Sequence, residues 1–229
     1  MTSPYDCIVP VSGGKDSTRQ ALWIREKFGI NPLLVMLSYP PEQITDRGTE
    51  NISNLIELGF DVIISAPSPK TWKALVKEGF MTFTNWAKST ELALYSFVPR
   101  LAINYGIPLI LWGENPALQL GDLNTLGKNG YDGNNLRNMN TIGGGNMQWI
   151  EDLKFSKSLQ LHPYKYPLQE EFLKNNIQII YLGWFMENWS LKNNAVQSSL
   201  HGLQLRTDTV ENTGDLMGAS ALDEDWVTL

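Results

Sequence analysis

The 229-residue sequence is poor in the residues that build disulfides and zinc sites. It contains one cysteine, Cys7, and two histidines, His162 and His201. A single cysteine cannot form a disulfide within the chain, and this set is too small for a closed Cys/His zinc site. We therefore expect no disulfide framework and no zinc centre, and we expect both histidines to have structural roles.

Excess positive charge is also lacking. The chain has 18 Lys and Arg residues against 24 Asp and Glu residues, a formal net charge of −6, and only 18% of its residues are charged. Proteins that bind the phosphate backbone of nucleic acids need a concentrated basic surface. This composition argues against a nucleic-acid partner, although it leaves room for a local anion site.

Long hydrophobic runs are missing as well. The longest apolar stretches, at residues 107–112 and 179–186, are far shorter than the roughly 20 residues that cross a bilayer. The first residues carry no basic segment of the kind that opens a secretory signal. We therefore expect no membrane association and take the cytoplasm as the default compartment.

The residues that are present indicate an α/β fold. Continuous apolar runs, typical of strands buried on both faces of a sheet, alternate with segments of helical periodicity. Such alternation predicts a doubly wound parallel sheet with helices on both faces. We expect strands at residues 6–11, 32–37, 60–64, 107–112 and 177–182, and helices at residues 15–28, 44–58, 70–80, 87–105, 168–175 and 188–202.

We predict one α/β domain over residues 1–185 and a helical or irregular extension over residues 186–229. Asparagine and glycine dominate residues 124–146 of the domain. This segment reads as a long loop, either a flexible surface loop or a lid whose amides bind sugar hydroxyls. Trp149, Trp184 and Trp189 could stack on a substrate ring, but core packing is the simpler interpretation.

The motif with the clearest chemistry follows the first predicted strand and opens the first helix. It reads Ser12-Gly13-Gly14-Lys15-Asp16-Ser17-Thr18. Adjacent glycines let backbone N–H groups surround an anion, the helix start adds partial positive charge, and the lysine adds a full charge. The three hydroxyl groups are further donors. The motif therefore predicts a phosphate site.

Two common nucleotide-binding patterns do not fit this motif. A Walker A loop would need glycine where Val9 stands and a hydroxyl residue directly after Lys15, where Asp16 stands. The three spaced glycines of the dinucleotide-binding Rossmann pattern are also missing. An ordinary P-loop ATPase and a dehydrogenase are therefore excluded.

The motif is similar to the Ser-Gly-Gly-x-Asp-Ser signature of the PP-loop ATP pyrophosphatases, and residues 12–17 match it fully. The resemblance implies a five-stranded sheet of order 3-2-1-4-5, the adenine nucleotide alpha hydrolase-like fold, with ATP at its carboxyl edge. It also implies cleavage of ATP between the α and β phosphates.

The same resemblance implies roles for individual residues. Lys15 and the glycine amides would stabilise the departing pyrophosphate, and Asp16 would hold Mg²⁺. Adenine would lie near Leu37 and Ser38, at the end of the second strand. Gly113 and Glu114, at the end of the fourth strand, would approach the nucleotide, and Glu114 is either a second Mg²⁺ ligand, a base or a solvated loop charge.

A closer resemblance concerns the N-acetyl sugar amidotransferases of bacterial surface-polysaccharide and flagellin-sugar synthesis. It rests on residues 5–18, 31–35, 182–185, 214–216 and 221–226. It implies that ATP activates the acetamido oxygen of a nucleotide-linked sugar and that ammonia then displaces AMP to give an acetamidino group. Ammonia would come from separate glutaminase and cyclase-like subunits. Family members extend beyond both ends of this sequence, so we expect a truncated chain.

Three alternatives stay open. The chain could be another ammonia-dependent ligase of the PP-loop type, a tRNA sulfur transferase, or a nucleotide-binding sensor without turnover. Persulfide chemistry needs a reactive cysteine, whereas Cys7 lies inside the first predicted strand. That position disfavours tRNA sulfur transfer.

Overall fold

The computed structural model describes residues 3–38, 44–121, 126, 128–153, 156–207, 218–220 and 222. Its centre is a five-stranded, all-parallel sheet in the order β3-β2-β1-β4-β5. This confirms the predicted fold class and strand order. The strands are β1 (Cys7–Pro10), β2 (Pro32–Leu37), β3 (Val62–Ser65), β4 (Leu109–Trp112) and β5 (Gln178–Tyr181).

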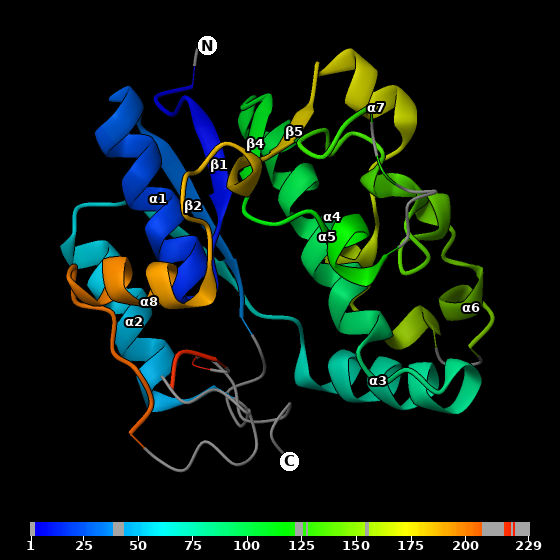
Figure 1. Cartoon of the computed structure of the whole chain (residues 1–229). Coiled ribbons are helices and arrows are strands. Elements are labelled where there is room, and N and C mark those ends of the chain that lie inside the picture. The colour runs from blue at the N-terminus through cyan, green and yellow to red at the C-terminus, as the bar shows by residue number, and fades with distance from the viewer. Residues whose placement is uncertain are drawn as a thin grey trace.

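Helices alternate with the strands, and most fall where the apolar periodicity predicts them (Figure 1). Helix α1 and strand β2 begin and end at the predicted residues, whereas the other predicted elements differ by a few residues at their ends. The α-helices are α1 (Lys15–Phe28), α2 (Asp46–Glu57), α3 (Pro69–Phe83), α4 (Lys88–Tyr105), α5 (Pro116–Leu120), α6 (Gln148–Glu151), α7 (Gln169–Lys174) and α8 (Leu191–Ser199). The apolar periodicity predicted no helix at α5 or α6.

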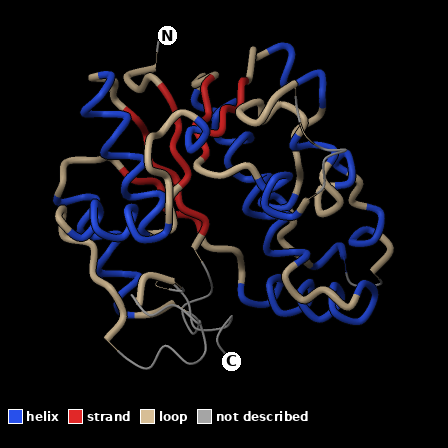
Figure 2. Tube along the Cα trace, viewed as in Figure 1, coloured by secondary structure: helices blue, strands red, loops and turns tan. Residues whose placement is uncertain are grey.

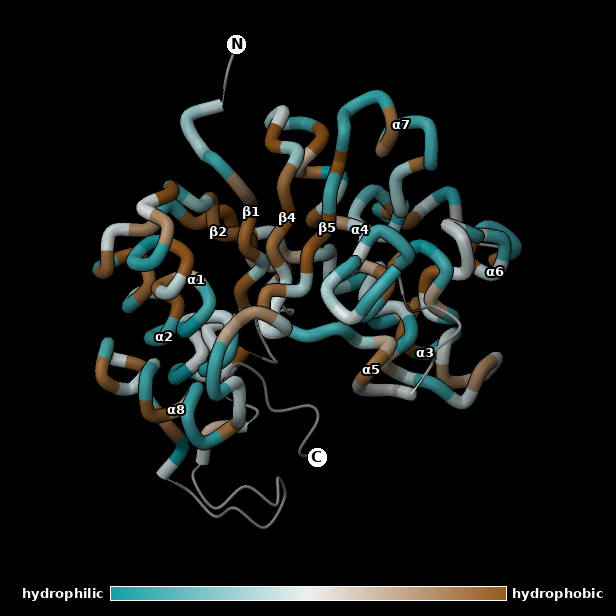
Figure 3. Tube along the Cα trace, turned by 45° about the horizontal axis from the view of Figure 1, so that its top comes forward, coloured by the Kyte–Doolittle hydropathy of each residue, from teal (hydrophilic) through white to brown (hydrophobic). Residues whose placement is uncertain are grey.

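Helices cover both faces of the sheet (Figures 1 and 2), and the sheet separates two hydrophobic clusters. On one face, Val9 of β1 and Leu34 of β2 pack against α1 and α2. On the other face, Ile8 and Leu33 pack against α3, α4 and the segment that follows α5. Neighbouring residues of a strand thus serve opposite faces, which is why these strands are apolar throughout. The brown strands in Figure 3 lie between more hydrophilic outer segments.

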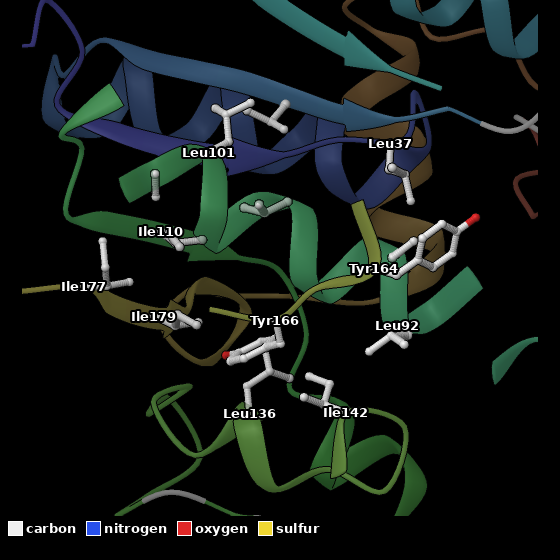
Figure 4. Packing of buried hydrophobic residues seen from close by; sticks show 14 of the residues in the cluster. Leu37, Leu92, Leu101, Ile110, Leu136, Ile142, Tyr164, Tyr166, Ile177 and Ile179 are labelled. Atoms are coloured by element: carbon white, nitrogen blue, oxygen red, sulfur yellow. The ribbon is translucent and has the colours of Figure 1, made fainter. Parts of the chain in front are cut away.

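The Asn/Gly-rich segment contributes three side chains to the core, although most of its described residues are exposed or half-buried. Leu136, Met139 and Ile142 are buried (Figure 4 shows the first and last). Gly133 N–H donates to the Ile179 carbonyl, and Tyr181 N–H donates to the Tyr131 carbonyl. Residues 131–134 therefore lie along the free edge of β5. Residues 124, 125 and 127 are outside the described residues.

The chain after β5 crosses to the opposite face and packs on α1 and α2. Helix α8 lies against α1, and Ser198 Oγ donates to the Lys15 carbonyl over 2.6 Å. Beyond α8, the Asn51 side chain of α2 exchanges two hydrogen bonds with the backbone of Gln204. These contacts fix the start of the C-terminal extension beside the loop formed by Ser12, Gly13 and Gly14, which we call the Ser-Gly-Gly loop. Residues 214–216, 221 and 223–226, used for the closer family resemblance, lie outside the described residues.

Within the described ranges, no helix combines the length and the apolar character needed to cross a bilayer.

The buried side chains of the Asn/Gly-rich segment should contribute to the free energy of unfolding. Ile142 is 1% exposed, and removing its side chain to alanine leaves a cavity that should cost about 2–5 kcal/mol of unfolding free energy. Leu173, 68% exposed on α7, is the matched control, since Leu173→Ala should cost about 0.5 kcal/mol or less. Urea unfolding measures both. Equal effects of the two substitutions on the free energy of unfolding would contradict the burial of the Ile142 side chain.

Candidate functional site

The candidate site lies at the carboxyl ends of β1 and β4. Strands β2 and β3 lie on one side of this pair and β5 on the other, so the chain reverses its direction across the sheet there. Ligands of doubly wound sheets bind in the crevice at such a point. A cavity of about 400 Å³ opens here. Its lining comprises Pro10, Val11, Ser12, Gly14, Lys15, Asp16, Ser17, Gln20, Leu37, Leu94, Tyr95, Trp112, Gly113, Glu114, Pro116, Ala219, Ser220 and Leu222.

The Ser-Gly-Gly loop has the backbone geometry of an anion site. Gly13 has a φ of +84° and is buried against α2, where an added Cβ would lie 3.3 Å from the Gly48 carbonyl oxygen. Gly14 is the N-cap of α1 and has no side chain that could bind the amides of the first turn. Those amides carry the positive end of the helix dipole. Lys15 and Ser17, from that turn, line the cavity.

Asp16 is held from two sides. Lys15 Nζ lies 2.7 Å from one of its carboxylate oxygens, and the Asn194 amide of α8 donates to the other. Arg19 in turn donates to the Asn194 side-chain oxygen and, over 2.9 Å, to the Glu187 carbonyl. Because Asn194 is 1% exposed, its amide is confined to this role. The network fixes the orientation of the Asp16 carboxylate.

A second cavity of about 470 Å³ adjoins the first. Both cavities are lined by Lys15, Asp16, Gly113 and Glu114, which form their junction. The second cavity is also lined by Asn115, Leu118, Gly130, Tyr181, Gly183, Trp184, Trp189, Ser190, Leu191 and Asn194. The two cavities therefore share the charged side chains of Lys15, Asp16 and Glu114.

The predicted site residues divide into two groups. Eight line the first cavity: Ser12, Gly14, Lys15, Asp16, Ser17, Leu37, Gly113 and Glu114. The other three, Gly13, Thr18 and Ser38, are buried next to them. Gly13 shapes the turn, Thr18 N–H donates to the Gly14 carbonyl, and Ser38 N–H donates to the Ser65 carbonyl after β3. Gly13 and Thr18 thus stabilise the loop, and Ser38 stabilises the edge of the sheet.

Several residues of the site were missed by sequence reasoning. Gln20, 1% exposed, donates its side-chain amide to the Leu111 carbonyl and so ties α1 to β4. Tyr95 of α4 faces the first cavity, and burial, together with the nearby Glu91 and Glu114 carboxylates, raises the pKa of its hydroxyl, which stays protonated. No local sequence pattern predicts the role of Asn194, because that role depends on the packing of α8 on α1.

The three tryptophans have different surroundings. Trp149 packs against the core, with its ring centroid 5.6 Å from that of Phe83. Trp189 is half-buried and packs against the other hydrophobic layer while also lining the second cavity. Trp184 is 59% exposed. Core packing therefore describes Trp149 and Trp189 but leaves the Trp184 ring available to a ligand.

The junction fits a Mg²⁺ ion that is shared with phosphates. Mg²⁺ in nucleotide sites is held by one or two carboxylates, phosphate oxygens and water. Asp16 and Glu114 supply carboxylates to the same cavity, and each carboxylate oxygen of Asp16 has a lone pair beyond its present hydrogen bond. No cluster of three or more His, Cys, Asp or Glu residues suited to a metal occurs in the described part of the chain.

Comparisons with known proteins give similarity at the level of solved structures. No protein-family model matches the sequence, and no curated protein matches it. A predicted subunit of tRNA methyltransferase from Methanocaldococcus jannaschii is 18% identical, with a TM-score of 0.40, over 85% of this chain and 75% of that one.

Two further solved structures are also similar to this chain. The U34-tRNA thiolase NcsA from Methanococcus maripaludis, solved with its [4Fe-4S] cluster, is 16% identical, with a TM-score of 0.31, over 86% of this chain and 64% of that one. NMN synthetase from Francisella tularensis is 15% identical, with a TM-score of 0.40, over 90% of each chain. Likenesses of this size assign no activity to the chain.

The environment of Cys7 predicts an inert thiol. Cys7 is fully buried in β1, and burial, with a contribution from Asp6, raises its pKa to about 12. The reactive thiolate is therefore scarce at pH 8. Iodoacetamide should modify Cys7 of the folded chain at least about 100-fold more slowly than Cys7 of the urea-unfolded chain. Comparable rates in the two states would contradict this placement.

The Asp16 network predicts a role for Asn194 in binding Mg-nucleotide. Asn194→Ala removes a hydrogen bond to a charged group, a loss of about 1.5–3 kcal/mol. Calorimetric titration with a non-hydrolysable ATP analogue should show binding weakened by about tenfold or more in the presence of Mg²⁺. Gln197→Ala, on the exposed side of the same helix, should bind as the wild type does. Unchanged binding by folded Asn194→Ala protein would contradict the role.

Proposed function

We propose that the chain is an ATP-dependent enzyme that forms AMP and pyrophosphate, and that its acceptor is the acetamido group of a nucleotide-linked sugar. The observation that carries the first part is the Ser-Gly-Gly-Lys-Asp-Ser loop at the carboxyl end of β1, in the crevice beside β4. Backbone amides, hydroxyl groups and one lysine converge there on a cavity large enough for a nucleotide. The second part rests on the resemblance of the sequence to the sugar amidotransferases.

The loop supports departure of pyrophosphate. Negative charge grows on the β-phosphate oxygens as the bond between the α phosphorus and the bridging oxygen breaks. The first-turn amides of α1 and the Lys15 ammonium stabilise that charge. Lys15 has three N–H donors and uses one toward Asp16, so two remain for phosphate oxygens.

The carboxylates at the junction support the metal-bound form of the nucleotide. Mg²⁺, when bound with ATP, supplies positive charge that neutralises the phosphates and polarises the reacting phosphoryl group. Asp16 holds its carboxylate ready for this ion because Lys15 and Asn194 fix it. Glu114, at the end of β4, offers a second carboxylate on the opposite side of the crevice.

The reaction has two balanced steps. The acetamido oxygen attacks the α phosphorus, a new P–O bond forms, and the bond to the bridging oxygen breaks, with its electron pair leaving on pyrophosphate. Ammonia then attacks the activated amide carbon, and the C–O bond to AMP breaks. The products are AMP, pyrophosphate and a protonated acetamidino group, whose new nitrogen keeps two of the three ammonia hydrogens while the third is released as a proton.

Ammonia must come from another source. A glutaminase uses a nucleophilic cysteine, and the only cysteine of this sequence, Cys7, is buried in β1 with a raised pKa. We therefore propose separate glutaminase and cyclase-like subunits as the ammonia-supplying partners, in keeping with the sequence resemblance.

A second candidate is another adenylate-forming PP-loop enzyme, either an ammonia-dependent ligase or a tRNA sulfur transferase. The crevice loop favours this general class as strongly as it favours the sugar enzyme, because the loop handles ATP and not the acceptor. The buried Cys7 and the net charge of −6 disfavour the sulfur transferase. A nucleotide sensor without turnover is the non-catalytic alternative.

Product analysis tests the proposed reaction. The chain is incubated with Mg-ATP, ammonium chloride and a panel of UDP-linked N-acetyl sugars, with RNA and a free carboxylic acid as alternative acceptors. We expect AMP and pyrophosphate in equal amounts, dependent on one of the sugars. ADP as the nucleotide product would contradict the cleavage between α and β phosphates, and dependence on RNA or the acid would favour the second candidate.

The lysine of the loop gives the matched mutational test. Lys15→Ala removes the charge that meets the leaving pyrophosphate, and AMP formation should fall by about 100-fold or more. Lys27→Ala, which removes an exposed positive charge at the other end of α1, should leave the rate within about twofold of the wild type. Equal losses in both variants would indicate a general charge effect and contradict the assigned role.

A further inference from the structure

We propose that the second cavity is an acceptor subsite for an uncharged ring that carries an amide carbonyl, and that Trp184 is the surface on which the ring stacks. The proposal deepens the proposed function and rests on it for the identity of the reacting group. The proposed subsite binds the ring of the acceptor and not any phosphate groups attached to that ring.

The Trp184 ring is both supported and accessible. It lies over the backbone of Gly130, so closely that a Cβ added to Gly130 would be 2.2 Å from Trp184 Cζ3. Gly130 is itself fixed, because its carbonyl accepts a hydrogen bond of 3.0 Å from the buried Asn115 side chain. With one side supported, the ring still keeps 59% of its surface exposed. A large aromatic surface held in this way suits a stacking ligand.

Apolar side chains continue the wall around Trp184. Leu118 of α5 and Leu191 of α8 are 45% and 43% exposed and line the same cavity. Trp189 closes the inner side, with its ring against Gly113 and Gly183 at the positions where a Cβ would stand 3.2–3.4 Å away. A sugar presents C–H groups on the faces of its ring, and such faces pack on indole rings.

The polar groups of the second cavity do not suit a phosphate. Its charged lining residues are Lys15, Asp16 and Glu114, which give one positive and two negative charges, and Lys15 is already paired with Asp16 at 2.7 Å. The loop residues Ser12, Gly14 and Ser17 line only the first cavity among the residues described. An anion therefore finds its donors in the first cavity, and an uncharged group is favoured in the second.

The junction places such a ring beside the reacting phosphate. Gly183 N–H donates to the Gly113 carbonyl over 2.8 Å, which joins the ends of β4 and β5 into a continuous edge. Gly113 belongs to both cavities, together with Lys15 and Asp16. A ring held on Trp184 can direct its amide oxygen across this edge toward a nucleotide bound at the Ser-Gly-Gly loop.

Indole NMR signals test the proposal independently of turnover. The ¹⁵N-labelled chain, saturated with a non-hydrolysable ATP analogue and Mg²⁺, is titrated with N-acetylglucosamine as the uncharged probe and with N-acetylglucosamine 1-phosphate as the anionic one. We expect the Trp184 indole signal to shift with the uncharged sugar. Trp184→Ala should weaken that binding by about tenfold, and Trp184→Phe by about threefold or less, since a ring remains.

Phe185→Ala is the matched control, because Phe185 is the adjacent aromatic residue, is 51% exposed and packs on Tyr131 instead of the cavity. It should bind the sugar as the wild type does, and all three variants should bind the ATP analogue within about twofold of the wild type. Two results would overturn the proposal: no shift at Trp184 with either sugar, or saturation of the Trp184 signal by the ATP analogue alone. Failure to form AMP with any acceptor would instead refute the proposed function and leave the sugar-binding result standing.

Discussion

The position of the Asp16 carboxylate depends on a contact between two segments that are far apart in the sequence. Asp16 and Asn194 are 178 residues apart, yet the Asn194 amide binds one carboxylate oxygen while Lys15 holds the other. Ser198, from the same helix, binds the Lys15 carbonyl. The loop is therefore anchored by α8 as well as by the sheet. An isolated strand, loop and helix would supply the donors without orienting the carboxylate.

In the proposed reaction, each of the two cavities would bind one substrate. The first holds the anion donors: loop amides, hydroxyl groups and the Lys15 ammonium. The lining of the second includes three aromatic and two leucine side chains. The residues common to both cavities, Lys15, Asp16, Gly113 and Glu114, would place charge where the two proposed substrates meet. Such a separation would let one enzyme bind a highly charged nucleotide and an uncharged acceptor group side by side.

Local sequence signals predicted much of the fold and part of the site. Strand β2 and helix α1 were predicted with their ends because their apolar patterns are uninterrupted and Gly29, with a φ of +64°, ends the helix. The polar composition of the Asn/Gly-rich segment hid its three core residues, Leu136, Met139 and Ile142, which recur every three residues and are buried. Asn194 and the Trp184 wall arise from long-range packing, which local periodicity does not encode.

A crystal structure with Mg²⁺ and α,β-methylene-ATP would show whether the Ser-Gly-Gly loop binds the phosphates of ATP. The methylene bridge blocks cleavage between the α and β phosphates while preserving the charge of the triphosphate. We expect phosphate oxygens within hydrogen-bonding distance of the first-turn amides of α1 and of Lys15 Nζ. A triphosphate bound elsewhere, with the loop vacant, would show that the loop is not the phosphate site.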